Sequence, residues 1–142
     1  MARFKFRLEQ VLKYRSQLED QARMVFAQAQ AELAAQAEKL ARLRKNLESQ
    51  ESKPYQSAQE YWLRGNFIRS LREDIAEAEI ALQRLELLVE RRRHEMVKAS
   101  QERQLLDKLK EKQAERHDHE QEIKEQNNLD EIASIRHEAQ VV

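Results

Sequence analysis

The sequence has almost none of the residues that make turns and covalent cross-links. Its 142 residues include one glycine, one proline and no cysteine, whereas ordinary domains carry roughly 7% glycine and 5% proline. So few turn residues argue against β-hairpins, sandwiches and strand–helix crossovers. The lack of cysteine excludes disulfides, thiolate metal sites and cysteine nucleophiles. We therefore expect long helices in a reducing compartment.

Long apolar runs are missing as well. Arg3, Lys5 and Arg7 interrupt the first apolar residues, so no signal-peptide core is seen. Nowhere does the sequence hold the run of about 20 apolar residues that a membrane-spanning helix needs. We expect a cytoplasmic protein with no direct membrane insertion.

Neither sign of charge is in excess, since 26 basic side chains balance 26 acidic ones. Residues 1–64 nevertheless carry a net charge of +4 and residues 65–142 a net charge of −4, so the two halves should attract each other. Nucleic-acid binding needs a concentrated positive surface. The basic start of the chain is a weak signal for RNA or a membrane surface, and we expect no nucleic-acid partner.

Apolar periodicity predicts a first helix over about residues 5–50. Apolar residues recur every three or four positions there, as on one face of an α-helix. The face steps by one residue between Val25 and Phe26, which predicts a local change of packing. The stripe consists of Leu8, Val11, Leu18, Ala22, Val25, Phe26, Ala29, Leu33, Leu40, Leu43 and Leu47.

A second helix is predicted over about residues 67–127. Its apolar seam alternates by three and four without a slip over more than five heptads, which is typical of a coiled coil. Only Arg92 and Arg103 interrupt the seam, and their stems can pack while their charges reach water. The seam consists of Ile68, Leu71, Ile75, Ala78, Leu82, Leu85, Val89, Arg92, Met96, Ala99, Arg103 and Leu106.

The chain is expected to reverse in a connection at residues 51–66, which holds Pro54 and Gly65. Residues 57–60, Ser-Ala-Gln-Glu, fit a capping box. A short helix is therefore expected inside the connection, ending at Gly65 because glycine commonly follows a helix.

The two long helices should lie antiparallel. Paired residues of such a hairpin have a constant sum of residue numbers, and Leu47 with Ile68 and Leu8 with Leu106 give 115 and 114. The predicted fold is all-α: an antiparallel two-helix coiled-coil hairpin that forms a single domain, 1–142, and stays a monomer.

The helix is expected to continue without a partner after Leu109. Only Ala114 and Ile123 are apolar between residues 110 and 128, which predicts a single solvated helix. The segment 128–142 then carries a short apolar stripe that nothing in the chain is left to cover, and we interpret it as a docking stripe. It consists of Leu129, Ile132, Ala133 and Ile135.

No pattern in the sequence predicts catalysis. One glycine cannot build a phosphate-binding loop, so a nucleotide hydrolase is excluded. His117 and His119 are two positions apart and point away from each other on a helix, whereas metal ligands need a spacing of three or four. The run Arg91–Arg93 is interpreted as a solvated face. We expect no enzyme, no catalytic residue, no cofactor and no metal.

Four of the eight aromatic residues lie within 13 positions around the predicted reversal. Two interpretations stay open: they plug the end of the coiled coil, or they form a docking patch, because a two-helix tip has little interior. These residues are Tyr55, Tyr61, Trp62 and Phe67.

Three stretches together resemble the FliJ family, the small coiled-coil component of the bacterial flagellar type III export apparatus. They are FKFRLEQVLKYR at 4–15, LLDKLKEK at 105–112 and LDEIASIR at 129–136. Their order and spacing extend the resemblance over nearly the whole chain. For the middle of the chain, residues 49–66, the resemblance implies only the position of the hairpin tip.

The resemblance implies a stalk similar to the central stalk of rotary ATP synthases. Its implied partners are the hexameric flagellar export ATPase, the export gate membrane protein and export chaperones. The implied location is the cytoplasmic face of the inner membrane near the flagellar base, with peripheral attachment. Two alternatives stay open: an injectisome-type stalk protein, or a generic structural coiled coil whose seam would continue to both ends.

With these partners, two contact regions are predicted. The gate is expected at the hairpin tip and the ATPase at the open end, where the unpaired helix offers a slim polar shaft with charges of both signs. The gate set is Leu40, Leu47, Tyr61, Trp62, Phe67 and Leu71. The ATPase set is Phe4, Phe6, Leu8, Leu105, Leu106, Lys108, Leu109, Lys110 and Lys112.

Overall fold

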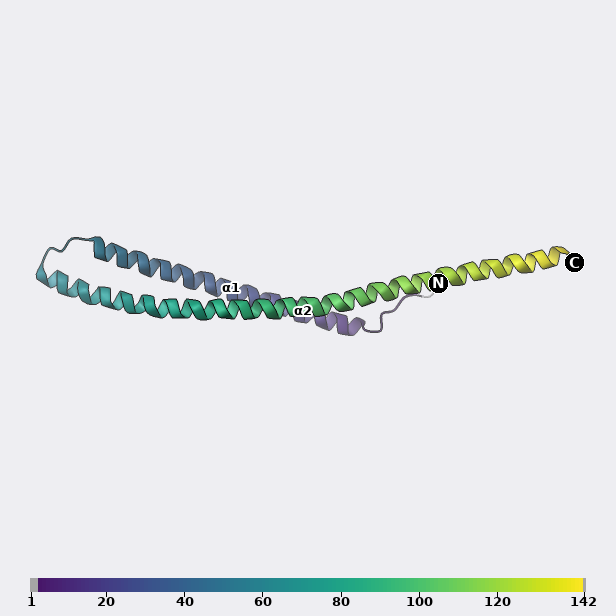
Figure 1. Cartoon of the computed structure of the whole chain (residues 1–142), viewed down its shortest axis with the longest axis horizontal. Helices are drawn as coiled ribbons and strands as arrows, with labels where there is room; N and C mark the ends of the chain where they lie inside the picture. Colours follow the sequence, from purple (N-terminus) through teal and green to yellow (C-terminus); the bar gives the residue numbers. More distant parts are fainter. Residues whose placement is uncertain (1–2, 142) are drawn as a thin grey trace. The chain divides into compact units, whose positions relative to one another are not determined.

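The computed structural model describes residues 3–141, which contain two helices and no strand (Figure 1). Helix α1 spans Glu9–Ser52 and helix α2 spans Ala58–Val141. The helices pack against each other in opposite directions, and within the described residues the last part of α2, residues 122–141, has no partner helix. The predicted all-α hairpin with an unpaired C-terminal helical extension is confirmed.

Helix α1 begins later than the periodicity predicts. Residues 3–8 are not helical, and the Glu9 amide donates a hydrogen bond of 3.2 Å to the Phe6 carbonyl in the turn before the helix. Phe6 is buried in this conformation, and the Phe4 ring lies 5.6 Å from the His117 ring of α2. The expected start near residue 5 was wrong because these contacts favour a non-helical segment.

Helix α2 begins at the predicted capping box. Ser57 Oγ accepts a hydrogen bond of 3.1 Å from the Glu60 amide, and the Glu60 carboxylate accepts one of 2.9 Å from the Gln56 amide. Only residues 53–57 connect the two helices, so the predicted short helix is the first part of α2.

The predicted break at Gly65 was wrong, because α2 runs through it without a positive φ. Glycine lowers helix propensity by only about 1 kcal/mol, which good helix formers and packing on both sides overcome. The expected helix end near residue 127 was also early. Two asparagines do not stop a helix whose flanking residues favour it.

The chain divides into two compact units. Unit 1 comprises Met1–Glu19 and Ala99–Val142, and unit 2 comprises Asp20–Lys98. Each unit contains a part of α1 and a part of α2. The contacts below lie within one unit or the other.

The core of unit 2 is a thin seam of small and medium side chains. Gln36 Nε2 donates a hydrogen bond of 3.3 Å to the Ala78 carbonyl across the two helices. All twelve seam positions predicted on α2 are buried or half-buried, which confirms the heptad pattern of that helix. The buried apolar side chains of unit 2 are Ala29, Leu40, Leu71 and Ala78.

The seam of α1 differs from the prediction. Leu12 is buried while Leu8, Val11 and Val25 are exposed, and no step occurs at Val25 and Phe26. Some seam positions of α1 are polar, so a search for apolar residues alone does not find them. When these positions are included, the seam residues alternate regularly by three and four. The positions with this spacing are Leu12, Arg15, Glu19, Ala22, Phe26, Ala29, Leu33, Gln36, Leu40, Leu43, Leu47 and Gln50, and Glu9 and Leu18 are half-buried as well.

The cross-helix contacts have residue-number sums from 114 to 123, and the hydrogen bond between Gln36 and Ala78, which sums to 114, agrees with the predicted sum of 114 to 115. In unit 2, Arg44 Nη2 lies 3.0 Å from Glu79 Oε1, a pair that sums to 123. In unit 1, Glu19 pairs with Arg103, which sums to 122. Long charged side chains can reach along the helices, so these ion pairs have larger sums than the hydrogen bond between Gln36 and Ala78.

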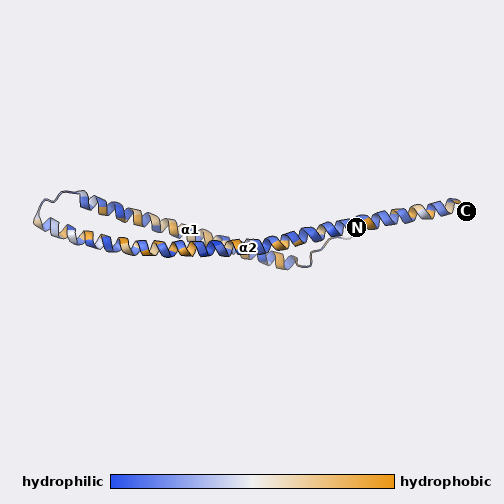
Figure 2. Cartoon of the chain, viewed as in Figure 1, coloured by the Kyte–Doolittle hydropathy of each residue, from blue (hydrophilic) through white to orange (hydrophobic). Residues whose placement is uncertain are grey.

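In unit 1, α2 keeps a partner farther than predicted. Lys110 Nζ lies 2.8 Å from Glu9 Oε2, and Lys110, Ala114 and His117 remain half-buried beside residues 3–9. From residue 122 to residue 141 every position is exposed. Apolar and polar residues are intermixed along both helices (Figure 2), and within residues 3–141 neither helix has an apolar stretch long enough to cross a membrane.

Candidate functional site

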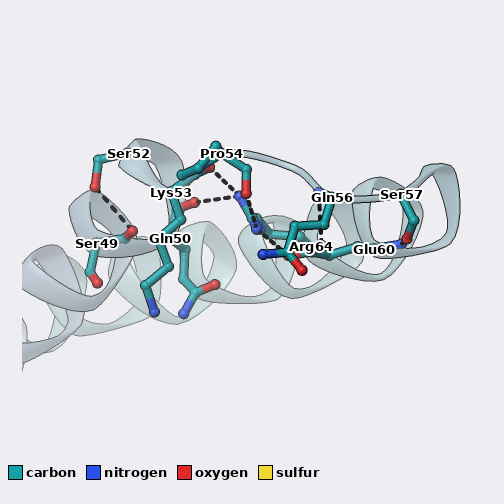
Figure 3. Close-up of polar contacts among 9 residues, drawn as sticks. All are labelled: Ser49, Gln50, Ser52, Lys53, Pro54, Gln56, Ser57, Glu60 and Arg64. Carbon is teal, nitrogen blue, oxygen red and sulfur yellow. Dashed lines mark hydrogen bonds and ion pairs between the residues drawn. The ribbon is translucent and has the colours of Figure 1, made fainter.

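The hairpin tip is organised by one arginine. Arg64, only 7% exposed, donates hydrogen bonds to the carbonyls of Lys53 and Pro54, the latter at 3.2 Å, and more weakly to Gln50 at 3.5 Å (Figure 3). Carbonyls at a helix C-terminus lack intrahelical donors and favour a cation. Arg64 therefore ties the start of α2 to the end of α1.

Glu60 completes this arrangement. Its carboxylate lies 2.5 Å from Arg64 Nη2 and also accepts the Gln56 amide. The backbone hydrogen bond from Gln56, followed by the hydrogen bond from Arg64, lowers the pKa of Glu60 below its ordinary value. Glu60 is thus held as an anion at the N-terminus of α2, where the helix dipole favours negative charge.

The tip aromatics divide into two groups. The Arg64 guanidinium stands over the Tyr55 ring, 4.2 Å from its centre, and the Tyr61 ring meets Tyr55 edge-on at 4.9 Å. These two tyrosines close the tip around Arg64 through cation–π and edge contacts. Trp62, 66% exposed, and Phe67 have no ring contact within the described residues, so they are available to a partner.

The predicted gate set is therefore split between interior and surface. Leu40 and Leu71 are buried and Leu47 is half-buried, so these leucines pack in unit 2. Tyr61, Trp62 and Phe67 are exposed.

Two shallow grooves flank the tip. The first lies between the end of α1 and the start of α2, and the second lies along α2 around Gly65. The first is lined by Gln50, Lys53, Ser57, Gln59, Glu60, Leu63, Arg64 and Phe67.

The predicted ATPase set, all in unit 1, is likewise mixed. Phe4, Phe6, Leu106 and Lys110 are buried or half-buried where the N-terminal segment meets α2. The exposed members are Leu8, Leu105, Lys108, Leu109 and Lys112.

An ion-pair network in unit 1 was missed by the sequence patterns. Arg103 Nε lies 2.6 Å from Glu19 Oε2, and Arg103 Nη1 lies 2.5 Å from Asp107 Oδ2. The hydrogen bonds with Glu19 and then with Asp107 raise the pKa of Arg103. Arg15 adds a second cross-helix ion pair, with Glu102 at 2.7 Å. Arg103 was recognised only as an interruption of the seam, and no sequence signal marked Glu19 as its partner.

The remaining predicted surface is the stripe near the C-terminus. Leu129, Ile132 and Ile135 are exposed on α2. Within residues 3–141, no three histidine, aspartate or glutamate side chains converge as metal ligands would.

Comparisons with known proteins give one match. No match was found among curated proteins or among solved structures. Residues 4–141 match the family described as flagellar FliJ protein, and this match covers nearly the whole chain. The helical hairpin fits that match, and we conclude that the chain belongs to the FliJ family, a structural family with a role in flagellar protein export.

Proposed function

We propose that this protein is a non-enzymatic stalk that engages the hexameric flagellar export ATPase and couples it to the export gate. The observation that carries the proposal is that each compact unit has its own set of exposed apolar and basic side chains. One set lies at the hairpin tip in unit 2, and the other lies on α2 in unit 1.

The ATPase contact belongs to unit 1. Leu105, 68% exposed, and Lys108 and Lys112 lie on α2 beside acidic residues, so the helix presents both signs of charge. A symmetric ring is better matched by several shallow contacts than by one deep pocket. The exposed stripe of Leu129, Ile132 and Ile135 supplies a further apolar contact on the same helix.

The gate contact belongs to the tip. Trp62 and Phe67 supply exposed aromatic area, and aromatic side chains dominate the energetics of many interfaces. Leu40, Leu47 and Leu71 act in this proposal by holding α1 and α2 together behind the patch. The protein works as a monomer at the cytoplasmic face of the inner membrane, and it also receives export chaperones.

Two matched variants of the full chain test the proposal. A tip variant carries Trp62→Ala and Phe67→Ala, and a shaft variant carries Leu105→Ala, Lys108→Glu and Lys112→Glu. We expect the tip variant to lose binding to purified gate protein and keep ATPase stimulation. We expect the shaft variant to keep binding to the gate protein and to lose ATPase stimulation.

Circular dichroism of both variants provides the folding control, since all five positions are exposed. The reversed result would assign the ATPase to the tip. Binding of neither partner by the wild-type chain would favour a generic structural coiled coil, and binding to an injectisome ATPase instead would favour the injectisome branch.

A further inference from the structure

Gly65, the only glycine of the sequence, lies inside helix α2, and within residues 3–141 neither its φ nor a side-chain contact requires a glycine there. Its φ is not positive, and apart from the adjacent residues and the neighbouring backbone of α2 itself, a Cβ atom added there would meet no atom of the described residues within 4 Å. Glycine inside a helix is less stable than alanine because it loses more backbone freedom on folding. The chain therefore carries a destabilising residue at a position where its own packing would accept a larger one.

Gly65 is one of the residues that line the second groove on α2. The missing side chain leaves room for another backbone to approach, which is a common use of glycine. Trp62 lies one turn before Gly65 on the helix, and Ile68 lies one turn after it. The groove is lined by Gly65, Ile68, Arg69, Arg72, Glu73 and Ala76.

The groove lining carries two cationic side chains, Arg69 and Arg72, and one acidic side chain, Glu73, which lies one turn after Arg69. The Arg69 side chain has no hydrogen bond or ion pair with any other residue of the described range 3–141. Arg72 Nη2 lies 2.8 Å from Glu51, but both side chains remain largely exposed. An occupant with an acidic side chain beside Arg69 would pair with it, and its apolar side chains would cover Ile68 and Trp62.

The shape of the groove favours a helix as the occupant. The groove is open and lined by a single helix, so it cannot enclose a small molecule as ligand cavities do. The amide and carbonyl groups of α2 are bonded within the helix, which leaves no edge for an added strand. Two helices pack 8–10 Å apart depending on the side chains between them, and Gly65 permits the close end of that range.

We propose that the Gly65 groove binds an amphipathic helix of the export gate protein, with its backbone over Gly65, its apolar face on Trp62 and Ile68, and an acidic side chain at Arg69. The identity of the partner rests on the proposed function. The chemistry of the occupant rests on the groove itself.

The test separates stability from binding at one residue. Gly65→Ala and Gly65→Leu are made in the full chain, with Ser70→Leu as the control because Ser70 is exposed on another face of the same helix. Thermal unfolding and affinity for the purified cytoplasmic part of the gate protein are measured for each variant.

We expect Gly65→Ala and Gly65→Leu to unfold at the same temperature as the wild type or higher. Affinity should fall about threefold for Gly65→Ala and at least tenfold for Gly65→Leu, while Ser70→Leu keeps wild-type affinity. Arg69→Glu should weaken binding, and an Arg69→Lys variant should restore most of it.

Unchanged affinity in both Gly65 variants, together with a loss in Trp62→Ala, would overturn this inference and leave the proposed gate contact standing. A wild-type chain that does not bind the gate protein would overturn both. If Gly65→Leu lowers the unfolding temperature, its affinity is not used, and the affinities of Gly65→Ala and Arg69→Glu for the gate protein decide whether the inference holds.

Discussion

Glu19 of α1 and Arg103 of α2 form an ion pair across the helix interface of unit 1, with Glu19 Oε2 2.6 Å from Arg103 Nε. Glu19 is only 5% exposed, and a charge removed from water is tolerated only when it is paired. A shift of the two helices by one turn would separate this pair. The pair therefore favours one register in a seam whose apolar residues would accept several.

Removing either partner alone should destabilise unit 1. We expect Glu19→Ala and Arg103→Ala each to lower the unfolding temperature, because each removes the cross-helix partner of a charge at the interface. The double variant Glu19→Leu with Arg103→Leu should recover stability, since apolar pairs often replace buried ion pairs without loss. Circular dichroism melts measure all three. A double variant as unstable as the singles would show that the pair supplies stability rather than register.

The arginine at the tip should control local opening of the loop. Arg64→Met keeps most of the side-chain volume but removes the hydrogen bonds to the carbonyls of Gln50, Lys53 and Pro54. We expect faster amide hydrogen exchange at the end of α1 and the start of α2, with little change elsewhere. Arg72→Met is the matched control, because its ion pair with Glu51 is largely exposed. Equal exchange at the tip of Arg64→Met and wild type would contradict the assigned role.

The tip should loosen in acid. The pKa of Glu60 is lower in the folded chain than its ordinary value of 4.5. The stabilisation it provides is therefore fully present above the ordinary pKa and is lost as the pH falls through the lower folded value. Fluorescence of Trp62, the only tryptophan, should report this change two residues away. Glu60→Gln should lack the transition, and an identical acid profile in that variant would assign the transition to another group.

Leu40 should matter for folding rather than for direct contact with the gate. It is 3% exposed, and truncation of a buried leucine costs about 2–5 kcal/mol. We expect Leu40→Ala to lose about 2 kcal/mol of unfolding free energy in urea, near the low end because the seam is thin. Leu63→Ala, an exposed control, should change it by less than about 0.5 kcal/mol. If folded Leu40→Ala binds the gate protein more weakly at low temperature, Leu40 would instead be a direct contact residue.

The chain should be a monomer in solution. Sedimentation at rising concentration is expected to give the mass of one chain, 17.0 kDa. A stable dimer would indicate that the exposed stripe around Ile132 pairs with a second copy, and Ile132→Asp would then restore the monomer.

The sequence predicted α2 better than α1 for a physical reason. The seam of α2 is apolar except at Arg92 and Arg103, so its period is visible in hydrophobicity alone. In α1, Glu19 and Gln36 occupy seam positions, and only their partners across the interface explain why. A pattern of apolar residues alone then assigns exposed apolar residues such as Val25 to the seam. This assignment produced the predicted step between Val25 and Phe26, which the structure does not have.

The sequence was sufficient to predict which regions carry the candidate surfaces, but not the role of each residue within them. Exposed Trp62 and Phe67 follow from the crowding of aromatics at a two-helix tip. The role of Arg64 does not follow, because its partners are backbone carbonyls that no sequence pattern displays. Gly65 was interpreted as a helix end, since glycine has that role far more often than a place in a helix interior.

Arg64 holds the loop through carbonyl oxygens of Gln50, Lys53 and Pro54, and a carbonyl oxygen is the one group that every amino acid supplies. Substitutions at these three positions can therefore change side-chain size and charge while leaving the acceptors in place. Tolerance to mutation should be broad along the loop and narrow at position 64. The side chains of the loop can therefore change during evolution without loss of the loop conformation, provided that position 64 remains arginine.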